Sequence, residues 1–286
     1  MGEGVVYLNG DLVAADRAAV SVADAGLLHG ASVFTTLRSR HGRPFRLGRH
    51  IGRLLDNAAR IGLRHDADEA TLTDAVGRVL AANGHRDARI RITLTPGPVG
   101  DQPRPTTLVT AAQLINDPNW YAKGIRVMVS GVRQYAGDPT VGLKTGCYLT
   151  RILARQAAAA HGDDEALWFS TSGHLAEACF SNVFVVVEGR LATPPLSTPV
   201  LPGIVREAVI ELAAELDLPC RDDQPIDGPQ LQAAEEVLLT SSGAGVRPVV
   251  AVNKEPVGDG SPGPVARKLI AAYESLLERE CPPHKT

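Results

Sequence analysis

Apolar positions along the first 115 residues follow two spacings, one typical of strands and one typical of amphipathic helices. Segments in which β-branched and aromatic residues predict strands are 5–13, 33–47, 88–95 and 106–114. The turn sequences Asn9-Gly10-Asp11 and Arg40-His41-Gly42 divide the first two segments into pairs of strands. Helices are predicted over 47–63 and 69–83, and the apolar face of the first consists of Leu47, Ile51, Leu54, Leu55, Ala58 and Ile61.

The rest of the chain mixes strands and helices without a regular repeat. Strands are predicted over 125–132, 165–171, 174–180, 182–189, 190–194, 235–240 and 246–252. Helices are predicted over about 146–160, from Pro202 onward with the proline in the first turn, and over about 262–279. Polar turn residues at 115–124 separate the two sets. The sequence therefore predicts an α/β (α+β) protein with a small N-terminal domain at 1–116, an interdomain linker at 117–124 and a larger C-terminal domain at 125–286.

Composition narrows the class of protein. The 29 Lys and Arg residues nearly balance the 32 Asp and Glu residues, so the charge gives no sign of binding to nucleic acid or to an anionic membrane. No apolar run approaches the length of a membrane span, and the first ten residues do not resemble a signal peptide. Four widely spaced cysteines, Cys147, Cys179, Cys220 and Cys281, favour reduced thiols over disulfides or a metal site. We expect a cytoplasmic protein.

Lys144 is the first candidate for chemistry, because it lies among small and apolar residues in VGLKTGCY. An apolar environment disfavours the charged form of an amine, and a neutral amine can attack an aldehyde. Taken alone, the pattern fits an ordinary loop lysine with a solvated amine better.

Glu177 and Arg53 are two further candidates. Glu177 is the one acid in HLAEACFSNVF, where a carboxylate could hold a heterocyclic nitrogen in its protonated form. Strand alternation could equally turn it to solvent, although its same-face neighbours Leu175 and Cys179 are not polar. Arg53 lies three residues after His50 on the predicted helix, hence on the same side, and its guanidinium suits a phosphate. A helix arginine is, however, more often a surface residue.

Two segments could bind an anion through the backbone. In VLPGIVREA the helix start leaves the N–H groups of Gly203, Ile204 and Val205 without acceptors inside the helix. In LLTSSGAGV a strand ends in small residues at 241–245, which lets backbone approach a phosphate. Each pattern is common, but together with Arg53 they suggest one phosphate site. The sequence has no P-loop, no Gly-x-Gly-x-x-Gly fingerprint, no Gly-x-Ser-x-Gly elbow and no zinc-binding helix motif.

Seven segments in order along nearly the whole chain resemble class IV aminotransferases, the fold-type IV group of pyridoxal-5′-phosphate enzymes. They are 7–10, 24–38, 43–63, 144–154, 164–184, 193–206 and 235–249. The resemblance implies the D-amino acid aminotransferase-like fold, two α/β domains with pyridoxal 5′-phosphate between them, and a homodimer.

The resemblance also implies a role for each candidate residue. Lys144 would hold the cofactor as a Schiff base and then move a proton, and Glu177 would keep the pyridine nitrogen protonated. Tyr148 would lie near the phenolic oxygen of the cofactor. The residues implied to hold the phosphate are Arg53, Ile204, Val205, Ser242 and Gly243. Candidates for contact with the substrate are Phe34, Thr36, Arg104 and Ala244. Arg38 and Arg40 are alternatives to Arg104 for binding the substrate carboxylate.

Three branches of the family share features with the chain. The four-residue spacing from Lys144 to position 148 resembles D-alanine aminotransferases, which usually have tyrosine at position 34. HGASVF at 29–34 resembles branched-chain aminotransferases, which usually have glutamate where this chain has Thr35. The FTT at 34–36 resembles aminodeoxychorismate lyases.

We therefore expect an aminotransferase of amino acid metabolism that moves an amino group from a small amino acid or amine to a 2-oxo acid. The alternative is a 4-amino-4-deoxychorismate lyase that releases 4-aminobenzoate and pyruvate with the same residues. A third class, a structural protein without catalysis, would leave Lys144 and Glu177 without a role. No metal is expected.

Overall fold

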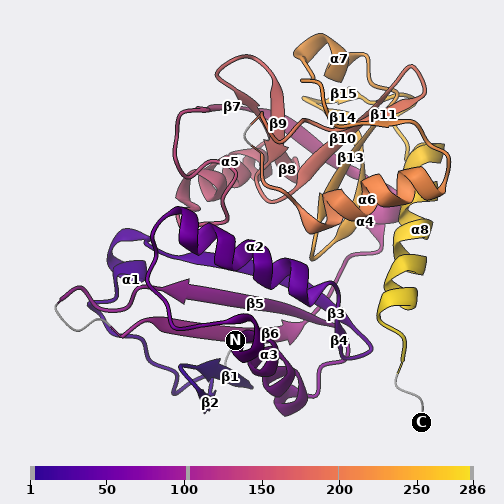
Figure 1. The fold of residues 1–286 in the computed structure, drawn as a ribbon. Coiled ribbons are helices and arrows are strands. Elements are labelled where there is room, and N and C mark those ends of the chain that lie inside the picture. The colour runs from indigo at the N-terminus through magenta and orange to yellow at the C-terminus, as the bar shows by residue number, and fades with distance from the viewer. Residues whose placement is uncertain (1–3, 101–103, 199, 284–286) are drawn as a thin grey trace. The chain divides into compact units, whose positions relative to one another are not determined.

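The computed structural model describes residues 4–100, 104–198 and 200–283, which form two units (Figure 1). Unit 1 consists of Met1–Ile115, Leu143–Cys147 and Leu277–Thr286, and unit 2 consists of Asn116–Gly142 and Tyr148–Leu276. The sequence prediction placed Lys144 in the C-terminal domain at 125–286, whereas in the structure Lys144 belongs to unit 1. The segment 143–147 belongs with unit 1 because it bonds to residues there: Phe34 N donates to Lys144 O at 2.9 Å and Gly146 N donates to Ser32 O at 2.8 Å.

Unit 1 is built on a six-stranded antiparallel sheet in the order β2-β1-β6-β5-β3-β4. Its strands are β1 (Val5–Leu8), β2 (Asp11–Ala14), β3 (Val33–Arg40), β4 (Arg43–Pro44), β5 (Ala88–Thr95) and β6 (Thr106–Gln113). The two predicted hairpins are confirmed as the pairs β1–β2 and β3–β4. Alternation on β3 and β5 sends Val33, Leu37, Ile90 and Ile92 into the core, so the intervening Phe34, Thr36 and Arg91 lie on the opposite face of the sheet.

The helices of unit 1 are α1 (Ala25–His29), α2 (Leu47–Arg60) and α3 (Glu69–Asn83). α2 packs on β3, and α3 packs on β1 and β6, so that helices and sheet share one hydrophobic core. The predicted apolar face of α2 is confirmed at Ile51, Leu54 and Ala58, which are fully buried. Ile61 lies past the end of the helix and is exposed.

Unit 2 contains a nine-stranded mixed sheet. Along the sheet the order is β12-β11-β10-β13-β14-β7-β8-β9, with β15 beside β14. The strands are β7 (Ile125–Gln134), β8 (Glu165–Ser170), β9 (Leu175–Ala178), β10 (Asn182–Val187), β11 (Arg190–Ala192), β12 (Cys220–Arg221), β13 (Glu236–Ser241), β14 (Gly245–Val252) and β15 (Glu255–Pro256). β7 runs parallel to both of its neighbours, β14 and β8. Strands β8, β9 and β10 are buried almost throughout, which is why they show no clear apolar alternation.

The helices that begin in unit 2 are α4 (Asn119–Ala122), α5 (Leu149–Ala160), α6 (Ile204–Glu215), α7 (Gly228–Gln232) and α8 (Pro264–Glu280). α5 begins three residues later than predicted, because Thr145 bridges to Val33 and Gly146 bonds to Ser32. Pro202 was wrongly expected in the first turn of α6, since Gly203 is the N-cap and the proline precedes it. The short elements α1, α4, α7, β12 and β15 were not predicted.

Within the part of the chain that the structure describes, no helix is both long enough and apolar enough to cross a bilayer. The same residues contain no cluster of three or more His, Cys, Asp or Glu side chains that could hold a metal ion. All four cysteines are free thiols.

Candidate active site

Lys144 is fixed in unit 1 through both of its backbone groups. Its carbonyl oxygen accepts from Phe34 N at 2.9 Å. Its N–H donates to the side-chain oxygen of Asn57 at 2.9 Å, with the Asn57 amide turned so that its nitrogen donates to Arg53 O at 3.3 Å. Thr145 extends the contact by bridging to Val33 on β3. The lysine side chain therefore leaves the backbone from a defined point next to β3 and α2.

Two cations lie against the ring of Phe34. The Lys144 Nζ is 4.8 Å from the ring centroid, and the Arg91 guanidinium carbon is 3.6 Å from it. Arg91 stands opposite Thr36 in the pairing of β5 with β3, on the face of the sheet turned away from the core. Arg91 is a candidate that the sequence prediction missed. The alternation in ARIRITLT could have indicated it, because this pattern puts Arg91 on the polar face.

Arg53 and His50 meet at the hydroxyl of Thr35. Arg53 Nη2 donates to Thr35 Oγ1 at 3.2 Å, and the same oxygen lies 2.9 Å from His50 Nδ1. The prediction that Arg53 and His50 share one side of the helix is therefore confirmed. Burial lowers the pKa of His50 well below its ordinary value, and the charges of Arg53 and Lys144 lower it further. A neutral His50 can accept the single proton of Thr35, which leaves the hydroxyl oxygen to accept from Arg53.

Glu177 lies on β9 in unit 2 and is buried, with only 3% of its surface exposed. Its Oε1 accepts from Arg151 Nη2 at 2.5 Å, and its Oε2 accepts from Leu201 N at 3.1 Å. Strand alternation does not turn this carboxylate to solvent, because β9 is buried on both faces. Since each carboxylate oxygen can accept two hydrogen bonds, Glu177 retains capacity for a further donor.

Tyr148 is the N-cap residue of α5. Its ring centroid lies 5.7 Å from that of Phe180, and the guanidinium carbon of Arg151 lies 5.5 Å from it. Tyr148, Arg151 and Glu177 therefore belong to one group of neighbours in unit 2.

The start of α6 offers N–H groups to an anion. Ile204 and Val205 are the first two residues of this helix, so their N–H groups have no acceptor within it. Gly203 is required here, because a Cβ would lie 1.9 Å from Asn182 Oδ1. Asn182 Nδ2 in turn donates to Leu201 O at 2.8 Å, which fixes the segment that leads into α6.

Residues 242–244 form the turn between β13 and β14. Ala244 N donates to Ser241 Oγ at 3.4 Å, Ala244 O accepts from Tyr121 at 2.8 Å, and Gly243 O accepts from Asn116 at 3.1 Å. The space beside Gly243 is open, since a Cβ there would meet no atom within 4 Å. Tyr121 and Asn116 therefore fix the backbone of the turn, while Ser242 and Gly243 are half-buried.

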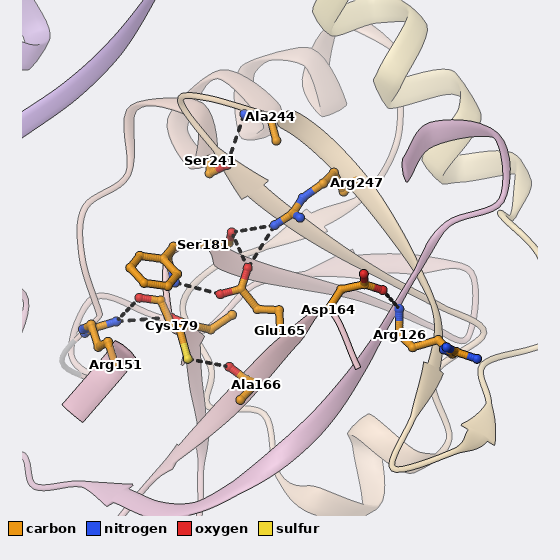
Figure 2. Close-up of polar contacts among 12 residues, drawn as sticks. Arg126, Arg151, Asp164, Glu165, Ala166, Cys179, Ser181, Ser241, Ala244 and Arg247 are labelled. Atoms are coloured by element: carbon orange, nitrogen blue, oxygen red, sulfur yellow. Dashed lines mark hydrogen bonds and ion pairs between the residues drawn. The ribbon is translucent and has the colours of Figure 1, made fainter. Parts of the chain in front are cut away.

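A buried ion pair supports the strands around Glu177 and this turn (Figure 2). Arg247 Nη2 lies 2.9 Å from Glu165 Oε2 and also donates to Ser181 Oγ at 3.3 Å. Glu165 Oε1 accepts from Phe180 N at 2.9 Å. The pair therefore connects β8 and β14 to the turn that follows β9. Cys179 in that turn points its thiol at Ala166 O, and burial raises the pKa of this thiol.

The remaining predicted residues are less directly connected. Thr36 is half-buried on β3, two residues after Phe34 and on the same face of the strand. Arg104 is exposed before β6, and residues 101–103 of the same loop lie outside the described residues. Arg40 forms an ion pair with Glu278 at 3.4 Å, while Arg38 is buried on β3.

Comparison with known proteins identifies the family. Residues 32–252 match the family model for amino-transferase class IV. The chain is 33% identical over 291 residues to the branched-chain-amino-acid aminotransferase of Salmonella typhimurium, covering 96% of this chain and 93% of that protein. It matches the crystal structure of the Escherichia coli branched-chain amino acid aminotransferase with a TM-score of 0.91 and 30% identity, over 97% of this chain and 96% of that one.

Two further solved structures bear on the cofactor and on the lyase alternative. A branched-chain amino acid aminotransferase solved with pyridoxamine 5′-phosphate matches with a TM-score of 0.90 and 29% identity, over 98% of this chain and 96% of that one. A structure from Legionella pneumophila, named as a 4-amino-4-deoxychorismate lyase, matches with a TM-score of 0.81 over 92% of this chain and 96% of that one. Its identity is 22%, so that likeness concerns the fold alone.

The fold is that of a fold-type IV pyridoxal-phosphate enzyme. The chain belongs to the class IV aminotransferases, whose substrates are amino acids and 2-oxo acids and whose cofactor is pyridoxal 5′-phosphate.

Proposed function

We propose that this protein is an aminotransferase in which Lys144 binds pyridoxal 5′-phosphate covalently, and that it moves the amino group of a small apolar amino acid to a 2-oxo acid. The observation that carries the proposal is the fixation of Lys144 through both backbone groups, beside the Phe34 ring. An ordinary loop lysine with a solvated amine does not require hydrogen bonds from its backbone to both β3 and α2.

The donor groups of the chain fit this cofactor. A phosphate needs N–H and O–H donors, and these are the N–H groups of Ile204, Val205 and Gly243 and the hydroxyl of Ser242. Arg53 adds a guanidinium. A pyridine nitrogen that is to stay protonated needs a buried carboxylate, and Glu177 has an acceptor position left for it. A phenolic oxygen suits the hydroxyl of Tyr148.

In this proposal each residue has one task. The bound cofactor would supply an electron sink that lowers the barrier to removal of the proton on the substrate Cα. Lys144 Nζ would take that proton and return it to a neighbouring carbon. Glu177 would hold the proton on the ring nitrogen, and His50 would keep the Thr35 hydroxyl oriented to accept from Arg53.

Phe34 and Thr36 are the proposed contacts of the substrate side chain, with Ala244 as a third. Arg91 is a better candidate for binding the substrate carboxylate than Arg104, Arg38 or Arg40. Its guanidinium contacts the ring of Phe34, and Lys144 Nζ contacts the same ring. The two most informative relatives act on branched-chain amino acids according to their names, so leucine, isoleucine and valine are the first donors to test. We also propose that the protein forms a homodimer, as its resemblance to the family implies.

The lyase alternative has less support, since its structural relative shares only the fold with this chain. The two activities are separated by incubating the holoenzyme with each donor and 2-oxoglutarate, and separately with aminodeoxychorismate. Keto acid formed only in the first reaction supports the aminotransferase. Release of 4-aminobenzoate and pyruvate without amino transfer would replace it with the lyase.

The direct test of the proposal is Lys144→Ala, with Lys268→Ala as the control because Lys268 is an exposed lysine on α8. We expect Lys144→Ala to lose the visible absorption band of lysine-bound cofactor and the half-reaction with every donor, whereas Lys268→Ala keeps both. A folded Lys144→Ala variant with an unchanged spectrum would refute the assignment of Lys144.

A further inference from the structure

Arg151 makes three hydrogen bonds within the group around Glu177. Its Nη2 donates to Glu177 Oε1 at 2.5 Å, while its Nη1 donates to Ala178 O at 3.2 Å and to Cys179 O at 3.0 Å. One guanidinium thus binds both the carboxylate and the backbone just after it, and Figure 2 shows Arg151 reaching that backbone. The planar fork of arginine makes such a contact rigid, because its donors have fixed relative directions.

The position of Arg151 is unfavourable for a cation on two counts. It lies in the first turn of α5, where the helix dipole disfavours positive charge. It is also mostly buried, with 19% of its side chain exposed against 4% for Glu177. Burial lowers the pKa of Arg151, but the charges of Glu177 and Tyr148 and the hydrogen bond from Arg151 to Glu177 raise it by more, so the net shift is upward. A buried ion pair adds little net stability compared with apolar residues, so stability alone does not explain why Arg151 is paired with Glu177.

The aromatic neighbours of Arg151 restrict the guanidinium further. The rings of Tyr148 and Trp168 lie 5.5 Å and 5.4 Å from its central carbon. With Leu201 N on the other oxygen, the Glu177 carboxylate is bonded from two sides and cannot rotate without losing a contact. A carboxylate that already faces a guanidinium presents less net negative charge to a third group than a lone carboxylate would.

We propose that Arg151 is a positioning residue, which fixes the Glu177 carboxylate and offsets its charge, and thereby sets how strongly Glu177 holds the proton on the ring nitrogen of the cofactor. This inference rests on the proposed function, in which Glu177 holds that proton. Arg151 itself touches neither the substrate nor the cofactor in this scheme.

The experiment compares holoenzymes of the unmodified protein, Arg151→Gln, Arg151→Lys and Arg155→Gln, each loaded with pyridoxal phosphate labelled with ¹⁵N in the ring. Arg155 is a matched control, because it also lies on α5 and also lies over an aromatic ring, that of Phe180 at 5.5 Å. Two readouts do not depend on turnover: the ¹⁵N chemical shift of the ring nitrogen and the pH titration of the visible band. The third is kcat against KM.

In Arg151→Gln the charge of Glu177 is no longer offset, so we expect the apparent pKa of the visible band to rise by about one unit. The ¹⁵N signal should move toward the protonated form, and kcat should fall about 10-fold with a smaller change in KM, because the carboxylate loses its fixed geometry. Arg151→Lys, which keeps the charge without the fork, should shift both signals in the same direction by less. Arg155→Gln should match the unmodified protein.

Titration and ¹⁵N shift of folded Arg151→Gln equal to those of the unmodified protein would overturn the inference while leaving the aminotransferase intact. If Arg151→Gln does not fold, the same two measurements are made on folded Arg151→Lys. A ¹⁵N shift and a titration equal to those of the unmodified protein would then overturn the inference. A protein that binds no cofactor in its unmodified form would instead refute the proposed function.

Discussion

Loss of Arg247 should destabilise unit 2 strongly, because it leaves a buried carboxylate without its cation. Glu165 is 3% exposed and would keep only the hydrogen bonds from Phe180 N at 2.9 Å and Ser181 Oγ at 3.4 Å. Removing one partner of a buried pair costs about 3–5 kcal/mol, and the two remaining donors favour the lower end, about 3 kcal/mol. Loss of the cation over the Trp120 ring, at 5.4 Å, adds about 0.5 kcal/mol.

Thermal unfolding of Arg247→Met, followed by circular dichroism, measures this cost. At roughly 2–4 °C per kcal/mol for a domain of this size, about 3.5 kcal/mol lowers Tm by roughly 7–14 °C. Arg190→Met is the control, since Arg190 is an exposed arginine on β11 and its loss should change stability by no more than about 0.5 kcal/mol.

A double variant tests the physical cause. Glu165→Gln combined with Arg247→Met removes the buried charge but keeps an oxygen that can accept from Phe180 N, so it should recover about 2 kcal/mol of the loss. A Tm for Arg247→Met within about 2 °C of the unmodified protein would refute the reasoning that the carboxylate depends on this partner.

Two further predictions concern the backbone anion site and the pH dependence of stability. Gly203→Ala should weaken cofactor binding and lower the free energy of unfolding by about 1–3 kcal/mol, because the added Cβ displaces the Asn182 side chain. Cofactor titration and thermal unfolding measure the two effects. Gly228→Ala is the control, because Gly228 also lies at a helix start but has open space beside it. Burial lowers the pKa of His50, so the unfolded chain binds a proton that the folded chain does not, and stability should fall as the pH drops below about 6.5. His50→Gln should reduce that fall in Tm between pH 7 and 5, whereas substitution of the exposed His29 should not; an identical slope in both variants would contradict the assignment.

Much of unit 1 could be predicted from the sequence, because its helices and sheet each bury one face. Ile51, Leu54 and Ala58 recur at helical spacing and are fully buried, so the register of α2 was predictable. The burial of Glu177 was not, since β9 is covered on both faces and such a strand shows no alternation. The two interpretations of Glu177 could be separated only by its neighbours in space.

The partners of the predicted site residues could not be derived from spacing. Arg53 and His50 were predicted to share a helix face, but Thr35, which joins them, lies on a strand whose position depends on tertiary packing. Arg151 and Glu177 are far apart in sequence, and nothing in the pattern of α5 indicates a carboxylate near its first turn. The start of α5 itself was misplaced, because the sequence does not show that residues 145–146 bond to β3 and the residue before it.

Leu201 connects two parts of unit 2 that would contact opposite ends of the cofactor. Its N–H is bonded to Glu177, its carbonyl is bonded to Asn182, and three residues later begins the helix whose first N–H groups suit a phosphate. Because both proposed contacts would share this short segment, we expect the free energies of binding at the ring nitrogen and at the phosphate to be coupled. Binding of pyridoxal and of inorganic phosphate as separate molecules would then be cooperative, and the affinity of the whole cofactor would exceed what either half contributes when measured alone.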